Sequence, residues 1–421
     1  MLYHLHEFQR AWLDPFAHLA GAVAQQLRDP HNPVGRLPGA RTVAANQALF
    51  HRLARRYGKP SFGLDEVEAH GARVRVSEQV VAATPFCRLV RFARATDDPE
   101  LAAVLARDVR VMVTAPLSGH HASLVRDTIK SLLHDHDVYV TDWVDAREVP
   151  LRDGSFSLDD YVTTVQRFIR TLGAGDLHVL AVCQPTVPVL AAIALLAQAG
   201  EATPRTMTLM GGPVDARISP TAVNRLATER SYAWFERNMT YTVPGIYPGA
   251  GRKVYPGFLQ LTAFVSMNPD RHLSSYRDYW RDVRRGAEGS AGCEAHERFY
   301  DEYNAVLDMD AAYYLETVRV VFQDFALARG AWDVHGVRVR PAAITATALA
   351  TIEGEQDDIS GPGQTEAAQT LCSSLRPDQR MHHVAPGCGH YGVFSGSKWR
   401  TSIYPRVRDF IREHSAAQLT G

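Results

Sequence analysis

The chain has 421 residues, of which 46% are hydrophobic and 22% are charged, and its formal net charge is −1. This length is compatible with about three average domains or with one large α/β core that carries an insertion. The balanced charge, without a stripe of Lys and Arg interleaved with aromatic residues, argues against nucleic acid as a partner. No apolar run approaches the roughly 18 residues that a membrane helix needs, so we expect no transmembrane segment.

The N-terminal sequence lacks a basic leader followed by an apolar stretch and a small-residue cleavage site, which predicts a cytoplasmic protein. The cysteines are odd in number and scattered, and no Cys-x-x-Cys pair suggests zinc or a redox dithiol. We therefore expect reduced thiols at all five positions, which are Cys87, Cys183, Cys293, Cys372 and Cys388.

Residues 1–86 are predicted to form an N-terminal helical extension. Apolar side chains recur there at steps of three and four, which indicates an amphipathic helix with a break near Pro15. These side chains are Leu5, Phe8, Trp12, Leu19, Val23 and Leu27. Packing against the body of the protein is the common role of such a face, and attachment to a lipid-like surface or a partner is the alternative.

From Cys87 onward, short β-like runs alternate with segments of helical length, which predicts a mostly parallel, doubly wound sheet. The strand-like runs are residues 109–116, 138–143, 177–183, 206–210 and 344–352. The helical segments are residues 122–133, 158–172 and 187–199. We assign residues 87–219 and 333–421 to this α/β core, with catalytic residues expected at the carboxyl ends of its strands.

The alternation stops over residues 220–332, a stretch rich in aromatic residues. An insertion between two strands of a sheet is naturally placed to cover the site, so we assign this stretch to a cap or lid domain. Most of its aromatic residues are expected to pack within the cap itself.

The segment around Cys183 carries the strongest functional signal. An apolar strand ends at Val182, and a helical run begins just after Pro185. This pattern is typical of a nucleophile elbow, a sharp turn that exposes a reactive side chain above the sheet. A packing role is the alternative, because cysteine is among the most buried residue types.

A cysteine nucleophile needs a base and a group that orients the base. Acidic residues of segment 353–359 follow one strand, and His390 follows a probable short strand at 381–385. The chain order of nucleophile, acid and histidine is that of the α/β-hydrolase fold. Each residue alone fits a turn or a cap, but their joint placement favours catalysis.

Two backbone N–H groups are expected to hold the oxyanion. One is that of Gln184, at the start of the helix after the elbow. The other is that of Leu117, or alternatively Ser118, in the loop after the strand at 109–116. His120 and His121 lie nearby, but adjacent histidines point in different directions and lack a carboxylate at ligand spacing, so we expect no metal.

The chain resembles the intracellular poly(3-hydroxybutyrate) depolymerases of polyester-storing bacteria. The resemblance covers nearly its whole length and rests on residues 2–10, 116–121, 139–143, 182–188, 255–260, 267–273, 299–304 and 388–392. It implies a catalytic triad of Cys183, Asp357 and His390, with the first residue of the Asp-Asp pair as the acid.

The resemblance also implies the substrate and its location. Ester bonds of amorphous, granule-bound polymer would be cleaved through a cysteine thioester, with release of 3-hydroxybutyrate oligomers or monomer. No cofactor is expected. Transfer of the acyl group from one thiol to another is nearly thermoneutral, so coenzyme A stays open as a co-substrate. The expected partner is the granule surface, and a homodimer stays open.

Two rivals remain. Polyester synthases use a cysteine elbow on the same fold, but they place glycines where this chain has Ala181 and Pro185. A non-catalytic granule-binding protein with a hydrolase fold is the second rival, and the intact triad argues against it.

Overall fold

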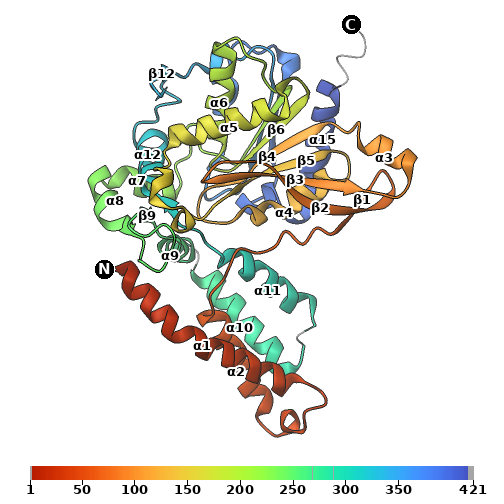
Figure 1. Cartoon of the computed structure of the whole chain (residues 1–421), viewed down its shortest axis with the longest axis vertical. Helices are drawn as coiled ribbons and strands as arrows, with labels where there is room; N and C mark the ends of the chain where they lie inside the picture. Colours follow the sequence, from red (N-terminus) through yellow and green to blue (C-terminus); the bar gives the residue numbers. More distant parts are fainter. Residues whose placement is uncertain (1, 268, 288, 416–421) are drawn as a thin grey trace.

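The protein is described by a computed structural model that covers residues 2–267, 269–287 and 289–415. Asn268, part of one motif above, and residues 416–421 of the predicted core lie outside the described residues. A nine-stranded sheet forms the centre, in the order β1-β2-β3-β5-β4-β6-β7-β13-β14 (Figure 1). Its strands are β1 (Glu66–Ala69), β2 (Ala72–Ala83), β3 (Cys87–Ala95), β4 (Arg110–Thr114), β5 (Asp137–Trp143), β6 (Leu177–Val182), β7 (Thr206–Met210), β13 (Ala348–Gly354) and β14 (Arg380–Ala385).

The strands β1, β2 and β3 pair antiparallel with their neighbours, including the pairing of β3 with β5. From β5 to β14 every pairing is parallel. The carboxyl ends of these six strands therefore meet at one edge of the sheet. The topology confirms the predicted α/β-hydrolase fold.

The buried strand β6 shows how the sequence produces the layers. Leu177, Val179 and Ala181 contribute to the hydrophobic cluster that contains α5 and α6. Leu180 and Val182 contribute to the other cluster, which contains α4 and α15. Because successive side chains of a strand point to opposite faces, a strand that is buried on both faces needs helices on both sides.

Helices enclose the sheet and continue beyond it. The core helices are α3 (Pro99–Leu105), α4 (Arg126–Leu132), α5 (Leu158–Leu172), α6 (Thr186–Gln198), α13 (Ala367–Leu371), α14 (Gly396–Lys398) and α15 (Tyr404–Ser415). The segment predicted as one helix over residues 122–133 is divided into the 3-10 turn η2 (Ala122–Val125) and α4. No described helix combines the length and apolarity needed to cross a membrane.

The insertion at 220–332 consists of helices and a small antiparallel sheet. Its elements are α7 (Ala222–Glu229), α8 (Tyr232–Met239), β8 (Tyr241–Thr242), β9 (Lys253–Tyr255), α9 (Gly257–Met267), α10 (Pro269–Arg285), α11 (Ala291–Tyr303), β10 (Met309–Asp310) and α12 (Ala311–Thr317). We refer to it as the cap. A backbone bond from Leu307 N–H to Gly119 O, 2.8 Å long, joins the cap to the loop after β4.

The N-terminal extension differs from the prediction in extent. Its helices are α1 (Leu2–Arg28) and α2 (Ala40–Ala54), which pack on each other and reach the cap, where α2 packs on α10. Residues 66–83, which we placed in the extension, form β1 and β2 of the main sheet. The extension therefore ends well before residue 86.

Two predictions about α1 are wrong. The helix passes through Pro15 without a break. Proline removes the hydrogen bond to the carbonyl of Ala11, and that residue is exposed, so water can replace the bond. Most of the large apolar side chains do not pack against the protein: Leu5, Phe8, Trp12 and Leu19 are between 51% and 65% exposed, whereas Val23 and Leu27 are half-buried.

Candidate active site

The Cys183 turn has the geometry of an elbow. It lies between β6 and α6, and the backbone of Cys183 has φ of +68°, in the left-handed region that non-glycine residues rarely adopt. The Cys183 N–H donates to Met210 O at 2.7 Å, and the Cys183 carbonyl accepts from Thr186 N–H at 3.1 Å. Cys183 alone among the five cysteines is not fully buried. The chain thus holds one accessible thiol in a strained turn.

The turn closes with the help of a neighbouring strand. A Cβ on Gly212, just after β7, would lie 2.3 Å from the Cys183 carbonyl oxygen and 1.9 Å from Thr186 Oγ1. The absence of a side chain at Gly212 therefore lets the chain after β7 approach the Cys183 turn closely. Pro185 is the residue just before α6, and its φ of −54° lies in the range that the proline ring fixes. Glycine is not required at position 185.

His390 and Asp357 meet at the same edge of the sheet. His390 Nδ1 lies 2.8 Å from Asp357 Oδ2, and the other oxygen, Oδ1, accepts N–H bonds from Ile359 and Ser360 at 2.9 and 2.8 Å. The Cys183 thiol also acts on the imidazole, since its charge and hydrogen bonding raise the pKa of His390. Since Nδ1 faces the carboxylate, Nε2 is the ring nitrogen left for the thiol.

The two loops that carry the acid and the base are bonded to each other. Gln356 N–H donates to Cys388 O at 2.9 Å, and Gly387 N–H donates to Glu355 Oε2 at 2.7 Å. These bonds connect the loop after β13 to the loop after β14. They fix the separation of Asp357 and His390.

The electrostatics of His390 suit a base beside a thiol. Burial alone would lower the pKa of the imidazole, but the charges and hydrogen bonds of Cys183 and Asp357 raise it well above its ordinary value. A protonated imidazole is thus stabilised when Cys183 is a thiolate. By contrast, burial raises the pKa of Cys388, so this neighbouring thiol is held neutral.

The two predicted oxyanion donors are available. Neither the Gln184 nor the Leu117 N–H has a hydrogen-bond partner among the described residues. Both residues are buried, and they belong to the turn after β6 and the loop after the adjacent strand β4. The Leu117 carbonyl accepts a bond from the Tyr313 hydroxyl at 3.1 Å, which connects this loop to the cap. Ser118, the alternative donor, is half-buried.

Sequence reasoning missed several residues that complete the site. Gly211 and Gly212 border it, and a Cβ on Gly211 would lie 3.4 Å from Asp357 Oδ2 and 3.6 Å from His390 Cε1. The Gly-Gly pair directly after a predicted strand was the available signal. Tyr313 lies in the predicted cap, and its place beside Leu117 follows only from the tertiary fold.

His120 and His121 belong to the covering of the site. His120 stacks on Phe264 of the cap and lies 3.3 Å from Tyr303 O. Burial lowers the pKa of both rings, to about 4 for His120 and about 3 for His121, where Lys59 contributes as well. Both are neutral side chains at neutral pH.

A cluster with metal-ligand chemistry lies elsewhere. Glu353, Glu366 and His382 bring one ligand atom each to within 4.8 Å of one another. Both oxygens of Glu353 accept backbone N–H bonds, at 2.7 to 2.9 Å, from Gly363, Thr365 and Glu366. The carboxylate holds the loop after β13.

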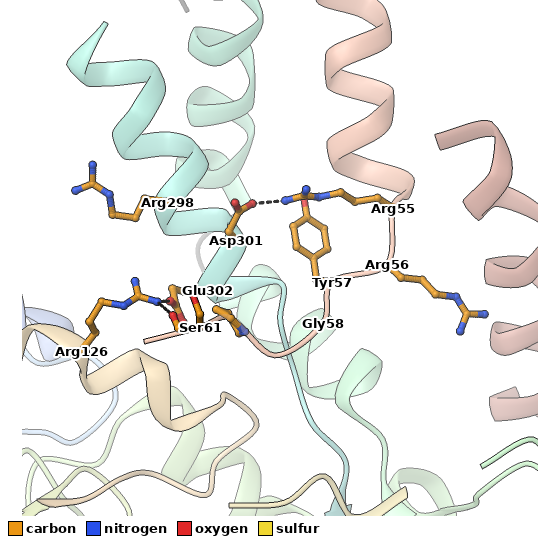
Figure 2. A pocket seen from close by; sticks show the side chains of 10 residues that line it. Arg55, Arg56, Tyr57, Gly58, Ser61, Arg126, Arg298, Asp301 and Glu302 are labelled. Carbon is orange, nitrogen blue, oxygen red and sulfur yellow. Dashed lines mark hydrogen bonds and ion pairs between the residues drawn. The ribbon is translucent and has the colours of Figure 1, made fainter. Parts of the chain in front are cut away.

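A cavity of about 390 Å³ lies between α2, α4 and α11, and Cys183 does not line it. Figure 2 shows that its walls are held by ion pairs, from Arg55 to Asp301 and from Arg126 to Glu302. Arg126 belongs to the core and the two acids belong to α11. The cavity therefore marks a charged junction between extension, core and cap.

Comparison with known proteins gives one family. Residues 211–415 match the family model described as PHB de-polymerase C-terminus. This range includes Asp357 and His390 and begins at Gly211. None of the curated proteins compared with this chain matches it.

Several solved structures are similar to this chain at low identity. The 2-hydroxy-6-oxo-6-phenylhexa-2,4-dienoate hydrolase of Rhodococcus sp. strain RHA1 is 13% identical, covering 81% of this chain and 99% of its own, with a TM-score of 0.43. The monoacylglycerol lipase of Paleococcus ferrophilus is 13% identical, covering 73% and 95%, with a TM-score of 0.40. A thermophilic esterase of Thermogutta terrifontis is 12% identical, covering 83% and 98%, also with a TM-score of 0.40.

These likenesses carry no information about the substrate. The strand order and the match of residues 211–415 decide the assignment. Residues 211–415 are similar to the PHB depolymerase family, and the chain is a carboxylic ester hydrolase with an α/β-hydrolase fold.

Proposed function

We propose that this protein hydrolyses the ester bonds of amorphous poly(3-hydroxybutyrate) through a cysteine acyl-enzyme. Cys183 is the nucleophile, His390 the base and acid, and Asp357 the residue that orients the imidazole. The observation that carries the proposal is the position of His390: its Nδ1 lies 2.8 Å from the Asp357 carboxylate, and Cys183 and Asp357 together raise the pKa of the imidazole.

In the first half of the reaction, His390 takes the proton of Cys183 and the thiolate attacks the ester carbonyl. The N–H groups of Gln184 and Leu117 donate to the resulting oxyanion. The tetrahedral intermediate then collapses, the C–O bond breaks, and His390 gives its proton to the departing hydroxyl end of the polymer. A 3-hydroxyacyl thioester on Cys183 remains.

In the second half, His390 removes a proton from water, and the hydroxide attacks the thioester. Collapse breaks the C–S bond, releases the carboxylic acid and returns the proton to Cys183. Asp357 keeps the Nδ1 proton in place through both halves, so Nε2 stays free to exchange protons. No cofactor takes part in these steps.

We further propose that the enzyme acts in the cytoplasm on polymer granules and releases oligomers or monomer. The match to the PHB depolymerase family supports this substrate. Coenzyme A remains an alternative acceptor for the acyl group, because a thioester and a second thiol exchange with little change in free energy. Product analysis decides between water and coenzyme A.

The test compares the native enzyme with Cys183→Ala on amorphous granules, with and without coenzyme A. We expect the native enzyme to release 3-hydroxybutyrate or its oligomers and Cys183→Ala to lose more than about a thousand-fold in rate. Cys388→Ala is the matched control, because it removes a buried thiol two residues from His390, and it should retain activity. Persistence of turnover in Cys183→Ala contradicts the mechanism. Polymer synthesis from 3-hydroxybutyryl-CoA, without acid release from granules, would instead identify a synthase.

A further inference from the structure

The helix α1 exposes its largest apolar side chains to solvent. Seven of them are between 41% and 65% exposed, namely Leu2, Leu5, Phe8, Trp12, Leu13, Phe16 and Leu19. The residues that α1 buries are mostly small, and they include Ala17, Ala20 and Ala24. A helix that packs only to form a stable core would bury its large apolar side chains and expose its alanines. We refer to the seven side chains as the outer face of α1.

The outer face is uncharged, with Gln9 as a polar residue within it. At 3.6 residues per turn its seven side chains span an arc of about 140°. The four charged residues of α1, which are Glu7, Arg10, Asp14 and Arg28, all fall outside this arc, and the helix contains no lysine. A contiguous apolar area of this kind marks an interaction surface.

The charged side chains next to the face are engaged inside the protein. Glu7 accepts a bond from Tyr247 at 2.7 Å and pairs with Arg56 at 3.3 Å. Arg10 donates to the Ala54 carbonyl at 3.1 Å. These residues fix α1 to the cap and to α2, and they are not displayed toward a charged partner.

The extension is held firmly in place. Arg52 of α2 donates to Asp301 at 2.8 Å and to the Glu297 carbonyl at 2.9 Å. Figure 2 shows that Arg55 pairs with the same Asp301. Figure 1 shows α1 along the outer edge of the molecule, beyond the cap helices α9 and α10. The outer face is therefore presented outward from the cap side of the sheet.

We infer that the outer face of α1 docks the enzyme on the surface of its solid polyester substrate. This inference rests on the proposed function, which supplies a water-insoluble, uncharged polymer with apolar methyl and methylene groups. An uncharged apolar helix face is complementary to such a surface. Helices that bind anionic lipid membranes carry Lys and Arg beside the apolar face. The helix α1 contains no lysine, and its Arg10 is engaged by the Ala54 carbonyl.

Docking through α1 keeps the enzyme on the granule while single chain segments enter the site. The face buries its apolar area without a change in the fold, because its side chains are already exposed. Polymer capture and bond cleavage are then carried out by different residues. They can be separated by mutation.

The test replaces three side chains of similar exposure, as Phe8→Gln/Trp12→Gln/Leu19→Gln. The matched control, Leu151→Gln/Leu226→Gln/Val337→Gln, removes three apolar side chains that are 55%, 44% and 53% exposed elsewhere. Both sets are combined with Cys183→Ala for binding measurements, so turnover does not change the particles. Binding is measured by co-sedimentation with amorphous poly(3-hydroxybutyrate) particles and with vesicles of phosphatidylcholine, alone or with phosphatidylserine.

We expect the α1 variant to lose about ten-fold or more in polymer affinity, while the control variant binds as the parent does. With Cys183 intact, the α1 variant should hydrolyse a soluble p-nitrophenyl 3-hydroxybutyrate ester at the parent rate. Both variants should keep the parent melting temperature, which shows that the fold is intact.

Three results would overturn the inference. Polymer binding of the α1 variant within two-fold of the parent excludes docking by this face. Binding of the parent to vesicles as strong as its binding to polymer identifies a general lipid-binding helix. A parent dimer that the α1 variant dissociates, with polymer binding unchanged, identifies an interface between two copies.

Failure of the proposed function gives a different result. If the native enzyme releases nothing from the polymer and cleaves no soluble ester, the function is wrong. The co-sedimentation comparison in the Cys183→Ala background still decides the role of α1.

Discussion

The carboxylates of Asp357 and Asp358 face different surroundings although the residues are adjacent. Asp357 is 5% exposed, and its carboxylate accepts two backbone N–H bonds besides its contact with His390. Asp358 is exposed. The turn 357–360 thus turns one carboxylate inward and leaves the next one outside. This difference makes the pair an internal comparison for the role of the acid.

We predict that Asp357→Asn lowers kcat/KM for a soluble ester by about 10³- to 10⁴-fold, whereas Asp358→Asn changes it by less than about three-fold. The first change removes the charge that stabilises the imidazolium and leaves the wrong tautomer. Steady-state kinetics on a soluble 3-hydroxybutyrate ester measures both. Equal losses in the two variants would contradict the assignment of the acid.

The same variant has a predicted pH signature. Asp357 is one of the groups that raise the pKa of His390, so its removal lowers that pKa. The thiolate–imidazolium pair then loses its proton at a lower pH, and the alkaline limb of the kcat/KM profile moves downward in pH. The Asp358→Asn profile should match that of the native enzyme. A purely structural role for Asp357 would reduce the amplitude and leave the limb in place.

At the scale of elements, the elbow depends on contacts from β7. Gly212 has no room for a side chain, because the nearest atoms to its Cβ position include the Cys183 carbonyl oxygen and Thr186 Oγ1. The carbonyl belongs to the backbone of the strained turn and cannot rotate away. A methyl group at this position must displace either the elbow or the end of β7.

We predict that Gly212→Ala destabilises the protein by about 1–3 kcal/mol and lowers kcat by more than ten-fold, since displacement of Cys183 also misaligns the thiol. Urea denaturation and turnover of a soluble ester measure the two effects. Gly175→Ala is the control, because no atom lies within 4 Å of its Cβ position. Unchanged turnover in Gly212→Ala would show that the elbow tolerates movement.

Elements with a single dominant pattern could be predicted from the sequence. The strand at 206–210 and the helix at 158–172 have the predicted bounds. In each segment the spacing of the apolar residues fits the secondary structure that forms there. The elbow and the loops of Asp357 and His390 follow from chain order. The roles of these residues in catalysis stay predictions.

Other elements depend on contacts that no local pattern contains. The strand β2 has mostly exposed residues, with burial of only alternate positions near its start, so its sequence gives a weak strand signal. Its place in the sheet depends on pairing with β1 and β3. The outer face of α1 has the pattern of a packed helix, and only the tertiary structure shows that alanines occupy the packing surface.

At the scale of the whole molecule, one buried cluster joins core, cap and extension. Asp145, after β5, accepts the Asp308 N–H at 3.2 Å and pairs with Arg147 at 3.1 Å. Asp308 of the cap accepts the Gly257 N–H at 2.8 Å and the hydroxyl of Tyr3 from α1. All three parts of the chain therefore depend on two neighbouring carboxylates.

This cluster is costly to ionise fully. Burial raises the pKa of Asp145, and the charge of Asp308 raises it further, against the opposing effect of Arg147. Burial also raises the pKa of Asp308. Two carboxylates in a buried site favour a state in which they share a proton.

The raised pKa values of Asp145 and Asp308 determine how the stability of the protein changes with pH. An aspartate with a raised pKa in the folded state keeps a proton that the unfolded chain has already lost above its ordinary value near 4. The folded state then binds more protons than the unfolded state, so the free energy of unfolding falls as the pH rises through that interval. The contribution of the cluster to the free energy of unfolding is thus smallest at alkaline pH.

We predict that Asp145→Asn flattens this dependence, because the amide stays neutral at every pH and its oxygen can still accept the N–H groups of Arg147 and Asp308. Melting temperatures measured from pH 5 to pH 9 should fall more steeply for the native protein than for the variant. Asp153→Asn, at an exposed position after the same strand, is the control and should follow the native curve. Parallel curves for the native protein and Asp145→Asn would show that ionisation of Asp145 does not determine how firmly cap and extension are held on the core.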